Sequence, residues 1–164
     1  MERKLSTILA LDVVGFSKLM ATDEDMTLAV LKQRRELIDL IIVEHGGRMF
    51  GSAGDSVIAE FSSPVKATEC AVKIQSKMQA INENIPENQK MRFRVGVNIG
   101  DVMIADDNLY GDAINVAARL EAKAEPEGIC ISKSVFDMVS EKVKASFENA
   151  GKLDLKNIEV PVEA

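Results

Sequence analysis

The sequence has few of the side chains that stack on exposed nucleic-acid bases. Its 164 residues include no tryptophan, one tyrosine and six phenylalanines, so aromatic residues make up 4% of the chain. Proteins that bind single-stranded nucleic acid combine such rings with a basic groove. The formal net charge of −6 also disfavours a surface that binds a polyanion. These two deficits predict no nucleic-acid partner, although a metal ion can still neutralise the phosphates of a small nucleotide.

Cysteine, histidine and long apolar runs are also scarce. Cys70 and Cys130 lie in apolar segments far apart in the sequence, and we expect them to be reduced core thiols. The only histidine, His45, has no cysteine or serine neighbour with which to form a nucleophilic triad. No apolar run approaches the roughly 18 residues of a membrane span, and no cleavable leader is visible. The sequence therefore predicts a cytoplasmic protein with no membrane association.

The remaining composition suits a hydrophobic core, and we expect residues 1–164 to form one domain. The hydrophobic fraction is 46% and the charged fraction 28%, both ordinary for a soluble globular protein. Apolar runs and alternating patterns predict strands over 6–14, 48–50, 56–61, 91–98, 102–105, 129–131, 152–155 and 160–162. Helical spacing predicts helices over 24–45, 64–81, 112–123 and 133–139.

The order of these elements indicates an α+β protein. A β-α-β-β-α-β order is typical of the ferredoxin-like split βαβ sandwich. We expect a mostly antiparallel sheet with the helices on one face, plus a C-terminal extension. The segment Gly100-Asp101 is expected to turn between the strands on either side of it, forming a second hairpin.

Two aspartates stand at the ends of apolar, strand-like segments. Asp12 interrupts the apolar run 6–17, and Asp55 ends the glycine-rich turn 51–55. A carboxylate at such a place is costly to bury unless it meets a partner, and the obvious partner is a cation. Two carboxylates beside flexible glycine backbone favour a hard-metal site that faces phosphates. The structural alternatives are a helix cap for Asp12 and a hairpin turn for Asp55.

Three further polar residues are candidates for anion binding. Asn115 and Arg119 are four residues apart on a predicted helix, so both project from one face of it. Asparagine is a poor helix former, so its place inside the helix requires a reason. Arg94 alternates with Phe93 on a strand and faces either solvent or an anion. Taken alone, each is also compatible with an ordinary surface residue.

Four ordered motifs resemble the catalytic domain of class III nucleotidyl cyclases, the adenylate and guanylate cyclase family. The resemblance extends from Thr7 to Val162. The first motif is an apolar strand with Asp-x-x-Gly-Phe-Ser at Leu11–Ser17, and the second is a Gly-Asp turn before a strand at Gly54–Phe61. The third is an Arg-Val-Gly strand at Arg94–Gly100, and the fourth is a helix with Asn-x-Ala-Ala-Arg at Tyr110–Arg119.

The resemblance implies a metal site and a phosphate site. Asp12 and Asp55, with the carbonyl of Val13, would hold two divalent ions, Mg²⁺ or Mn²⁺. The phosphates of a nucleoside triphosphate would be held by the backbone at Val14, Gly15, Phe16 and Ser17. Arg94 and Lys156 would contact the β- and γ-phosphates.

The resemblance also implies the catalytic pair and the partner. Asn115 would orient the ribose, and Arg119 would stabilise charge on the α-phosphate as the 3′-hydroxyl displaces pyrophosphate. Members of the family place the metal aspartates and the Asn/Arg pair on opposite subunits of a head-to-tail dimer. A homodimer is therefore implied, in which the alanine-lined face of the helix beside Arg119 would be the interface.

One departure from the family pattern concerns the base. Adenylate cyclases of the family usually have a lysine four residues before the second metal aspartate and an aspartate two residues before the aromatic-Gly pair. Here these positions are Gly51 and Asn108. A glycine donates no side-chain hydrogen bond, so the choice between ATP and GTP is left open.

Three functions are compatible with these residues. The first is a cyclase that makes a 3′,5′-cyclic nucleotide, most simply cyclic AMP from ATP. The second is a catalytically weak or inactive nucleotide-binding module that signals through dimerisation, which the missing base-reading side chains favour. A diguanylate cyclase also uses a split βαβ palm, but its Gly-Gly-(Asp/Glu)-(Asp/Glu)-Phe turn is absent.

Overall fold

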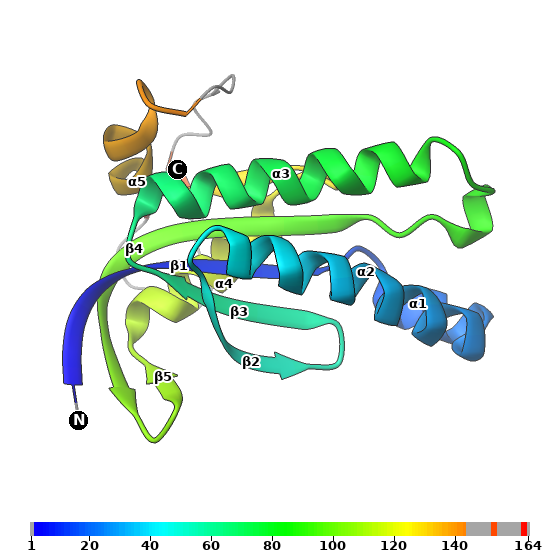
Figure 1. The fold of residues 1–164 in the computed structure, drawn as a ribbon, viewed down its shortest axis with the longest axis horizontal. Helices are drawn as coiled ribbons and strands as arrows, with labels where there is room; N and C mark the ends of the chain where they lie inside the picture. Colours follow the sequence, from blue (N-terminus) through cyan, green and yellow to red (C-terminus); the bar gives the residue numbers. More distant parts are fainter. Residues whose placement is uncertain (1, 144–151, 154–161, 164) are drawn as a thin grey trace.

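The computed structural model describes residues 2–143, 152–153 and 162–163, and Figure 1 shows its fold. The strands are β1 (Glu2–Val13), β2 (Arg48–Ala53), β3 (Ser56–Phe61), β4 (Phe93–Ala105), β5 (Asn108–Tyr110), β6 (Ile129–Ile131), β7 (Lys152–Leu153) and β8 (Val162–Glu163). The helices are α1 (Phe16–Thr22), α2 (Glu24–Glu44), α3 (Pro64–Asn82), the 3₁₀ turn η1 (Glu87–Gln89), α4 (Asp112–Lys123) and α5 (Lys133–Val139).

The main sheet is mostly antiparallel, so the predicted α+β fold is confirmed. Its strands follow the order β2-β3-β1-β4-β5, and β6 pairs in parallel with β4. The long central pair is β1 with β4, in register from Glu2 opposite Ile104 to Val13 opposite Phe93. The short strands β7 and β8 pair with each other. They agree in part with the strands predicted over 152–155 and 160–162, of which residues 154–161 lie outside the described residues.

Helices cover both faces of the sheet, which corrects the expectation of helices on one face only. Leu9 and Leu11 point into a core shared with α2, α3 and α5, and Figure 1 shows α2 and α3 lying along this face. The alternate residues Ile8 and Ala10 pack against Ala117 of α4 on the opposite face. The reason is that both faces of β1 are apolar, so each requires a cover.

The expected turn at Gly100-Asp101 does not exist, because β4 continues through it. Gly100 pairs with Ser6 of β1, and a Cβ at Gly100 would come within 2.8 Å of the Cβ of Ala113. This glycine therefore allows α4 to approach the strand. The chain instead turns at Asp106 and Asp107, whose φ angles are 49° and 64°, and aspartate tolerates this left-handed conformation better than most residues.

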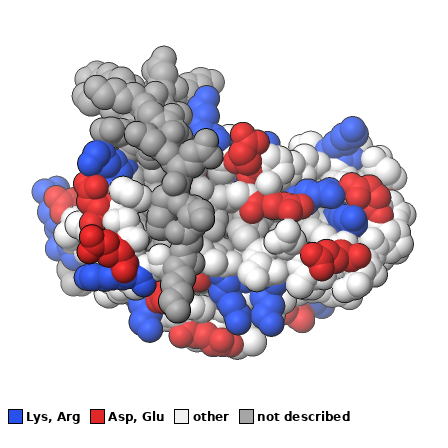
Figure 2. All heavy atoms as spheres, turned by 90° about the horizontal axis from the view of Figure 1, so that it is seen from above, with Lys and Arg blue, Asp and Glu red and all other residues white. Residues whose placement is uncertain are grey.

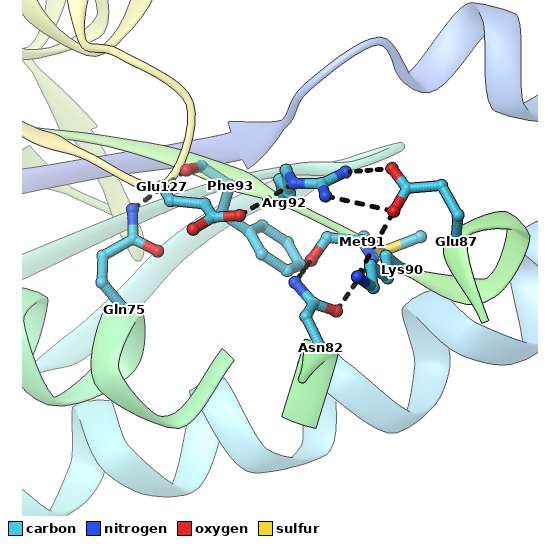
Figure 3. Close-up of polar contacts among 8 residues, drawn as sticks. All are labelled: Gln75, Asn82, Glu87, Lys90, Met91, Arg92, Phe93 and Glu127. Atoms are coloured by element: carbon cyan, nitrogen blue, oxygen red, sulfur yellow. Dashed lines mark hydrogen bonds and ion pairs between the residues drawn. The ribbon is translucent and has the colours of Figure 1, made fainter. Parts of the chain in front are cut away.

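A network of buried and half-buried polar side chains fixes the start of β4 (Figure 3). Gln75 of α3 donates to the carbonyls of Phe93 and Gly128 at 2.9 and 2.8 Å. Asn82 donates to the carbonyl of Met91 at 3.0 Å and accepts from its N–H at 3.3 Å. These bonds satisfy backbone groups where the loop enters the sheet.

Arg92 completes this network and joins it to the end of β1. Its guanidinium donates to Glu127 at 2.8 Å and to both oxygens of Glu87 at 3.1 and 3.4 Å (Figure 3). Its carbonyl accepts the N–H of Val14 at 2.8 Å. The segment after Asp12 is therefore tied to the residue just before β4. This bond fixes the direction in which the chain leaves β1.

Charges of both signs are interspersed on the face shown in Figure 2. Among the described residues on this face, arginine and lysine side chains lie among aspartate and glutamate, so these residues produce no extended field of one sign. Within the described ranges, no helix is both long enough and apolar enough to cross a membrane.

Candidate active site

The site lies on the face of the sheet that α4 covers, and a glycine determines how closely α4 packs there. Gly96 of β4 lies beneath α4, and a Cβ at this position would clash with the carbonyl oxygen of Ala117 and the N–H of Glu121. The absence of a side chain brings the helix backbone against the strand. Gly96 pairs with Ala10, and Ala10 and Asp12 point to the same face of β1. The last turn of α4 therefore lies over the side of the sheet to which Asp12 points.

The structure brings Asp12 and Asp55 together, as the sequence predicted. Asp12 lies near the end of β1, and Asp55 lies in the turn between β2 and β3, where Gly54 has a φ of 60°. The Oδ2 atom of Asp55 accepts the N–H of Val13 at 3.0 Å. This bond holds the turn against the end of β1, so the two carboxylates and the carbonyl of Val13 share one small region.

Glu121 is a third carboxyl group at this place, and the sequence reasoning missed it. It is 7% exposed, and its side chain donates a hydrogen bond to Asp12. The signal was present: Glu121 follows Ala113 and Ala117 at four-residue spacing on the buried stripe of α4. An acidic residue on such a stripe requires a polar partner.

Burial and mutual repulsion shift the pKa values of these carboxyls upward. The pKa of Glu121 is raised to about 9, first by burial and then by the hydrogen bond to Asp12 and the charge of Asp12. The pKa of Asp12 is raised by burial and by Asp55, against the lowering effects of the Glu121 hydrogen bond and of Arg94. The site is therefore short of positive charge.

Arg94 is the only described cation that lowers the pKa values of this group. Arg94 lies opposite Asp12 in the register of β1 and β4. Its Nε donates to the carbonyl of Ala124 at 2.9 Å. Of the two orientations expected from the sequence, the side chain takes the one that faces the acidic groups. This bond to Ala124 leaves the other end of the guanidinium available to an anion.

The loop after Asp12 fits the expected phosphate site in part. Gly15 has a φ of 65° and precedes α1, so Phe16 and Ser17 stand in the first turn, where amides have no intrahelical acceptor. The N–H of Val14, however, donates to the backbone carbonyl of Arg92, the residue just before β4. Val14 is therefore corrected from an anion donor to a structural residue of this loop.

The remaining predicted residues lie away from the carboxylates. Asn115 is exposed and Arg119 half-buried on α4, and within the described part of the chain no hydrogen bond or ion pair joins either one to Asp12 or Asp55. Gly51 lies on β2 and Asn108 begins β5. Lys156 lies outside the described residues.

The donor set suits a hard divalent ion. Carboxylate oxygens and a backbone carbonyl are the ligands that Mg²⁺ and Mn²⁺ prefer. The repulsion that raises the pKa of Asp12 would be relieved by a cation between Asp12 and Asp55. Among the described residues, no group of three or more His, Cys, Asp or Glu side chains has a geometry that could already hold a metal.

Comparison with known proteins gives relatives over almost the whole chain. The chain is 44% identical over 161 residues to the protein named "Putative adenylate cyclase 3" of Rhizobium meliloti (strain 1021), covering 98% of this chain and 27% of that one. It is 28% identical over 131 residues to an adenylate cyclase of Streptomyces coelicolor, covering 79% of this chain and 32% of that one. The chain therefore spans about a third or less of the length of these relatives.

Solved structures agree in fold and in part in sequence. A crystal structure titled adenylate/guanylate cyclase/hydrolase from Silicibacter pomeroyi is 41% identical, with a TM-score of 0.89 over 99% of this chain and 95% of that one. The adenylyl cyclase CyaB of P. aeruginosa shares the fold with a TM-score of 0.83 at 21% identity, over 99% of this chain and 94% of that one. Residues 2–162 match the family described as the adenylate and guanylate cyclase catalytic domain, and the chain belongs to that family.

Proposed function

We propose that this chain converts a nucleoside triphosphate, ATP in the first place, into the 3′,5′-cyclic nucleotide and pyrophosphate. The observation that supports this most is the meeting of Asp12, near the end of β1, with Asp55, in the turn between β2 and β3, with Arg94 beside them. In the reaction the ribose 3′-oxygen forms a bond to the α-phosphorus, the bond from that phosphorus to the pyrophosphate oxygen breaks, and the 3′-hydroxyl proton leaves to solvent.

The family implies two metal ions, and Asp12, Asp55 and the carbonyl of Val13 would hold them. When bound, such ions supply positive charge that lowers the pKa of the 3′-hydroxyl and neutralises the phosphates. The chain's own residues orient the substrate. Arg94 binds the terminal phosphates through its remaining N–H groups, and the backbone beyond Gly15 approaches them closely.

Asn115 and Arg119 act on the reacting end of the substrate. Because they are four residues apart on α4, their side chains project together. In this proposal Asn115 orients the ribose, and Arg119 stabilises the charge that develops on the α-phosphate. Since no hydrogen bond or ion pair among the described residues joins either one to Asp12 or Asp55, we propose that they complete the site of a second copy in a head-to-tail homodimer. Two unpaired cysteines support a reducing, cytoplasmic location.

Product analysis after incubation with ATP or GTP and Mn²⁺ tests the proposal. We expect Asp12→Asn and Asp55→Asn each to lower turnover by at least about a hundredfold with folding intact, because each removes a charged ligand. The control is Asp137→Asn, the same change in an exposed pair with Lys133 on α5, which should leave turnover unchanged. Turnover within a few-fold of the parent for either folded site variant would contradict the metal assignment.

The alternative is a nucleotide-binding module with little or no turnover. The glycine at position 51 and the asparagine at position 108 favour it, because two base-reading side chains of the family are missing. Tight binding of a nucleotide to the parent protein, with no cyclic product in Mg²⁺ or Mn²⁺, would decide for this alternative.

A further inference from the structure

Two arginines, two residues apart in the sequence, hold the turn that follows α4. Nε of Arg94 donates to the carbonyl of Ala124 at 2.9 Å, and Nε of Arg92 donates to the carboxylate of Glu127 at 2.8 Å. Figure 3 shows the Arg92 guanidinium between Glu127 and Glu87, and its Nη atoms donate to Glu87 at 3.1 and 3.4 Å. Arg92 therefore directs its guanidinium to two carboxylates, whereas Arg94 gives one N–H group to the turn.

The backbone at Glu127 has a conformation that favours glycine. Its φ angle is 68°, and within the described part of the chain the other non-glycine residues with positive φ are Asp106 and Asp107. Aspartate tolerates this left-handed region better than glutamate does, and glycine adopts it at no steric cost. A side chain that stands where the backbone disfavours it has its reason in a contact. The contact of Glu127 is the one with Arg92.

The backbone around Arg92 joins this turn to the loop that follows Asp12. The N–H of Glu127 donates to the carbonyl of Phe93 at 2.9 Å, and the carbonyl of Arg92 accepts the N–H of Val14 at 2.8 Å. Residues 92 and 93 thus contact the turn and the loop at the same time. A displacement of the turn would move the carbonyl of Ala124, and with it the guanidinium of Arg94, relative to this loop.

We propose that Glu127 and Arg92 are positioning residues for Arg94; this rests on the proposed function. Their ion pair fixes the turn 124–128, and the carbonyl of Ala124 then restrains Nε of Arg94. The remaining N–H groups of Arg94 are directed at the terminal phosphates of the substrate. A guanidinium restrained in this way loses less conformational freedom when the substrate binds. Neither Glu127 nor Arg92 would contact the substrate itself.

The sign of the Glu127 charge separates this role from a general charge effect. A triphosphate is negative, so loss of the charge alone would strengthen its binding, or leave it unchanged where solvent screens the charge. Loss of the positioning contact weakens the binding instead. The side chains of Arg92 and Glu127 are each 34% exposed, so their ion pair adds little to the stability of the fold. Glu127→Gly also relieves the backbone at this residue.

The test is the binding of 3′-deoxy-ATP and 3′-deoxy-GTP with Mn²⁺ by calorimetry, since neither nucleotide can be cyclised, and the variants are compared with the one that the parent binds more tightly. We expect Glu127→Gly and Arg92→Met each to weaken this binding about five- to thirtyfold. Their melting temperatures should stay within about 3 °C of the parent's. Glu127→Gln removes the same charge but keeps an oxygen that accepts from Arg92, so its affinity should stay within about twofold of the parent's. The matched control is Glu87→Gln, at the other carboxylate partner of Arg92, which should also stay within about twofold.

A double-mutant cycle shows whether the pair acts through Arg94. Arg94→Met should weaken binding at least as much as Glu127→Gly does. In the Arg94→Met background, Glu127→Gly should change the affinity by less than about twofold, because the side chain that it positions is already absent. Additive losses would overturn the inference. So would tighter binding by Glu127→Gly, failure of Glu127→Gly to fold, or a parent that binds neither nucleotide.

Product analysis separates the failure of this inference from the failure of the proposed function. Cyclic product from the parent, together with unchanged binding by Glu127→Gly, would overturn the inference and leave the proposed function standing. Weakened binding by Glu127→Gly that depends on Arg94, in a protein that forms no cyclic product, would support the inference and contradict the proposed turnover.

Discussion

At the scale of single residues, Glu121 shows how a close carboxyl pair fixes a site before any ligand binds. The side chain is almost fully buried and donates a hydrogen bond to Asp12, which requires a proton on Glu121. The charge left on Asp12 is then the one that a cation or Arg94 can neutralise. Glu121 thereby orients Asp12 from α4, while Val13 orients Asp55 from β1.

This pair predicts a pH dependence of stability in the metal-free protein. The pKa of Glu121 is raised from 4.5 to about 9, so the folded state binds its proton more tightly than the unfolded chain does. The free energy of unfolding should therefore fall as the pH rises from 4.5 to 9. Glu121→Gln keeps the hydrogen-bond donor and removes the charge. Thermal melts in EDTA should show a flatter pH profile and, at pH 9, a melting temperature higher than the parent's by at least about 2 °C.

Glu125→Gln is the matched control, since Glu125 is exposed just beyond the same helix. It should follow the parent's profile. If Glu121→Gln follows the parent's profile as well, Glu121 is not protonated in the folded protein, and the account of its bond to Asp12 is wrong.

At the scale of secondary-structure elements, the contact between α4 and β4 determines the geometry of the site. The Asn115 and Arg119 pair, and Glu121, all belong to α4. Their distance from the sheet depends on Gly96, the position where the helix backbone lies directly on the strand. Because the clashing atoms are backbone atoms, a neighbouring side chain cannot relieve a substitution there by rotating away.

Gly96→Ala is therefore expected to be destabilising although the change is a single methyl group. We expect a loss of about 1–3 kcal/mol in the free energy of unfolding, or more, because α4 must move outward. Gly51→Ala is the matched control, since its added Cβ meets no atom, and it should change stability by less than about 1 kcal/mol. Urea denaturation of the three proteins measures both. Equal stability of Gly96→Ala and the parent would show that α4 is held less closely than the structure indicates.

At the scale of the whole molecule, the two groups of site residues are separated, and this separation supports the proposed homodimer. Asp12 and Asp55 converge at the end of β1, whereas Asn115 is exposed and Arg119 half-buried on α4, and within the described part of the chain no hydrogen bond or ion pair joins either one to the two aspartates. In the proposed homodimer, each copy supplies Asn115 and Arg119 to the site of the other. The proposed homodimer would then contain two equivalent sites.

Mixed dimers test this arrangement. Asp12→Ala and Arg119→Ala should each be inactive alone, since each has one damaged group in every site. After the two variants are refolded together, random pairing makes about half of the dimers mixed, and each mixed dimer has one intact site. About a quarter of the parent activity should therefore return. The absence of recovery, with heterodimers shown by a tagged pull-down, would mean that these residues act within one chain.

Much of the fold followed from periodicity alone. The helix limits at 64 and 112, and those of the short helix 133–139, were predicted from the helical spacing of apolar residues, because this signal depends only on near neighbours in sequence. The two aspartates were found for a similar reason, because a carboxylate at the end of an apolar strand can be recognised from the sequence alone.

The tertiary structure decided what depends on contacts between distant segments. Gly100 was expected to make a turn, but pairing with β1 keeps it inside β4. Glu121 belonged to a helix that the sequence located, yet its partner Asp12 is more than a hundred residues away. The ion pair of Arg48, on β2, with Asp107, just before β5, likewise depends on strand register and sheet twist. Register and twist are properties of paired strands, which no local pattern specifies.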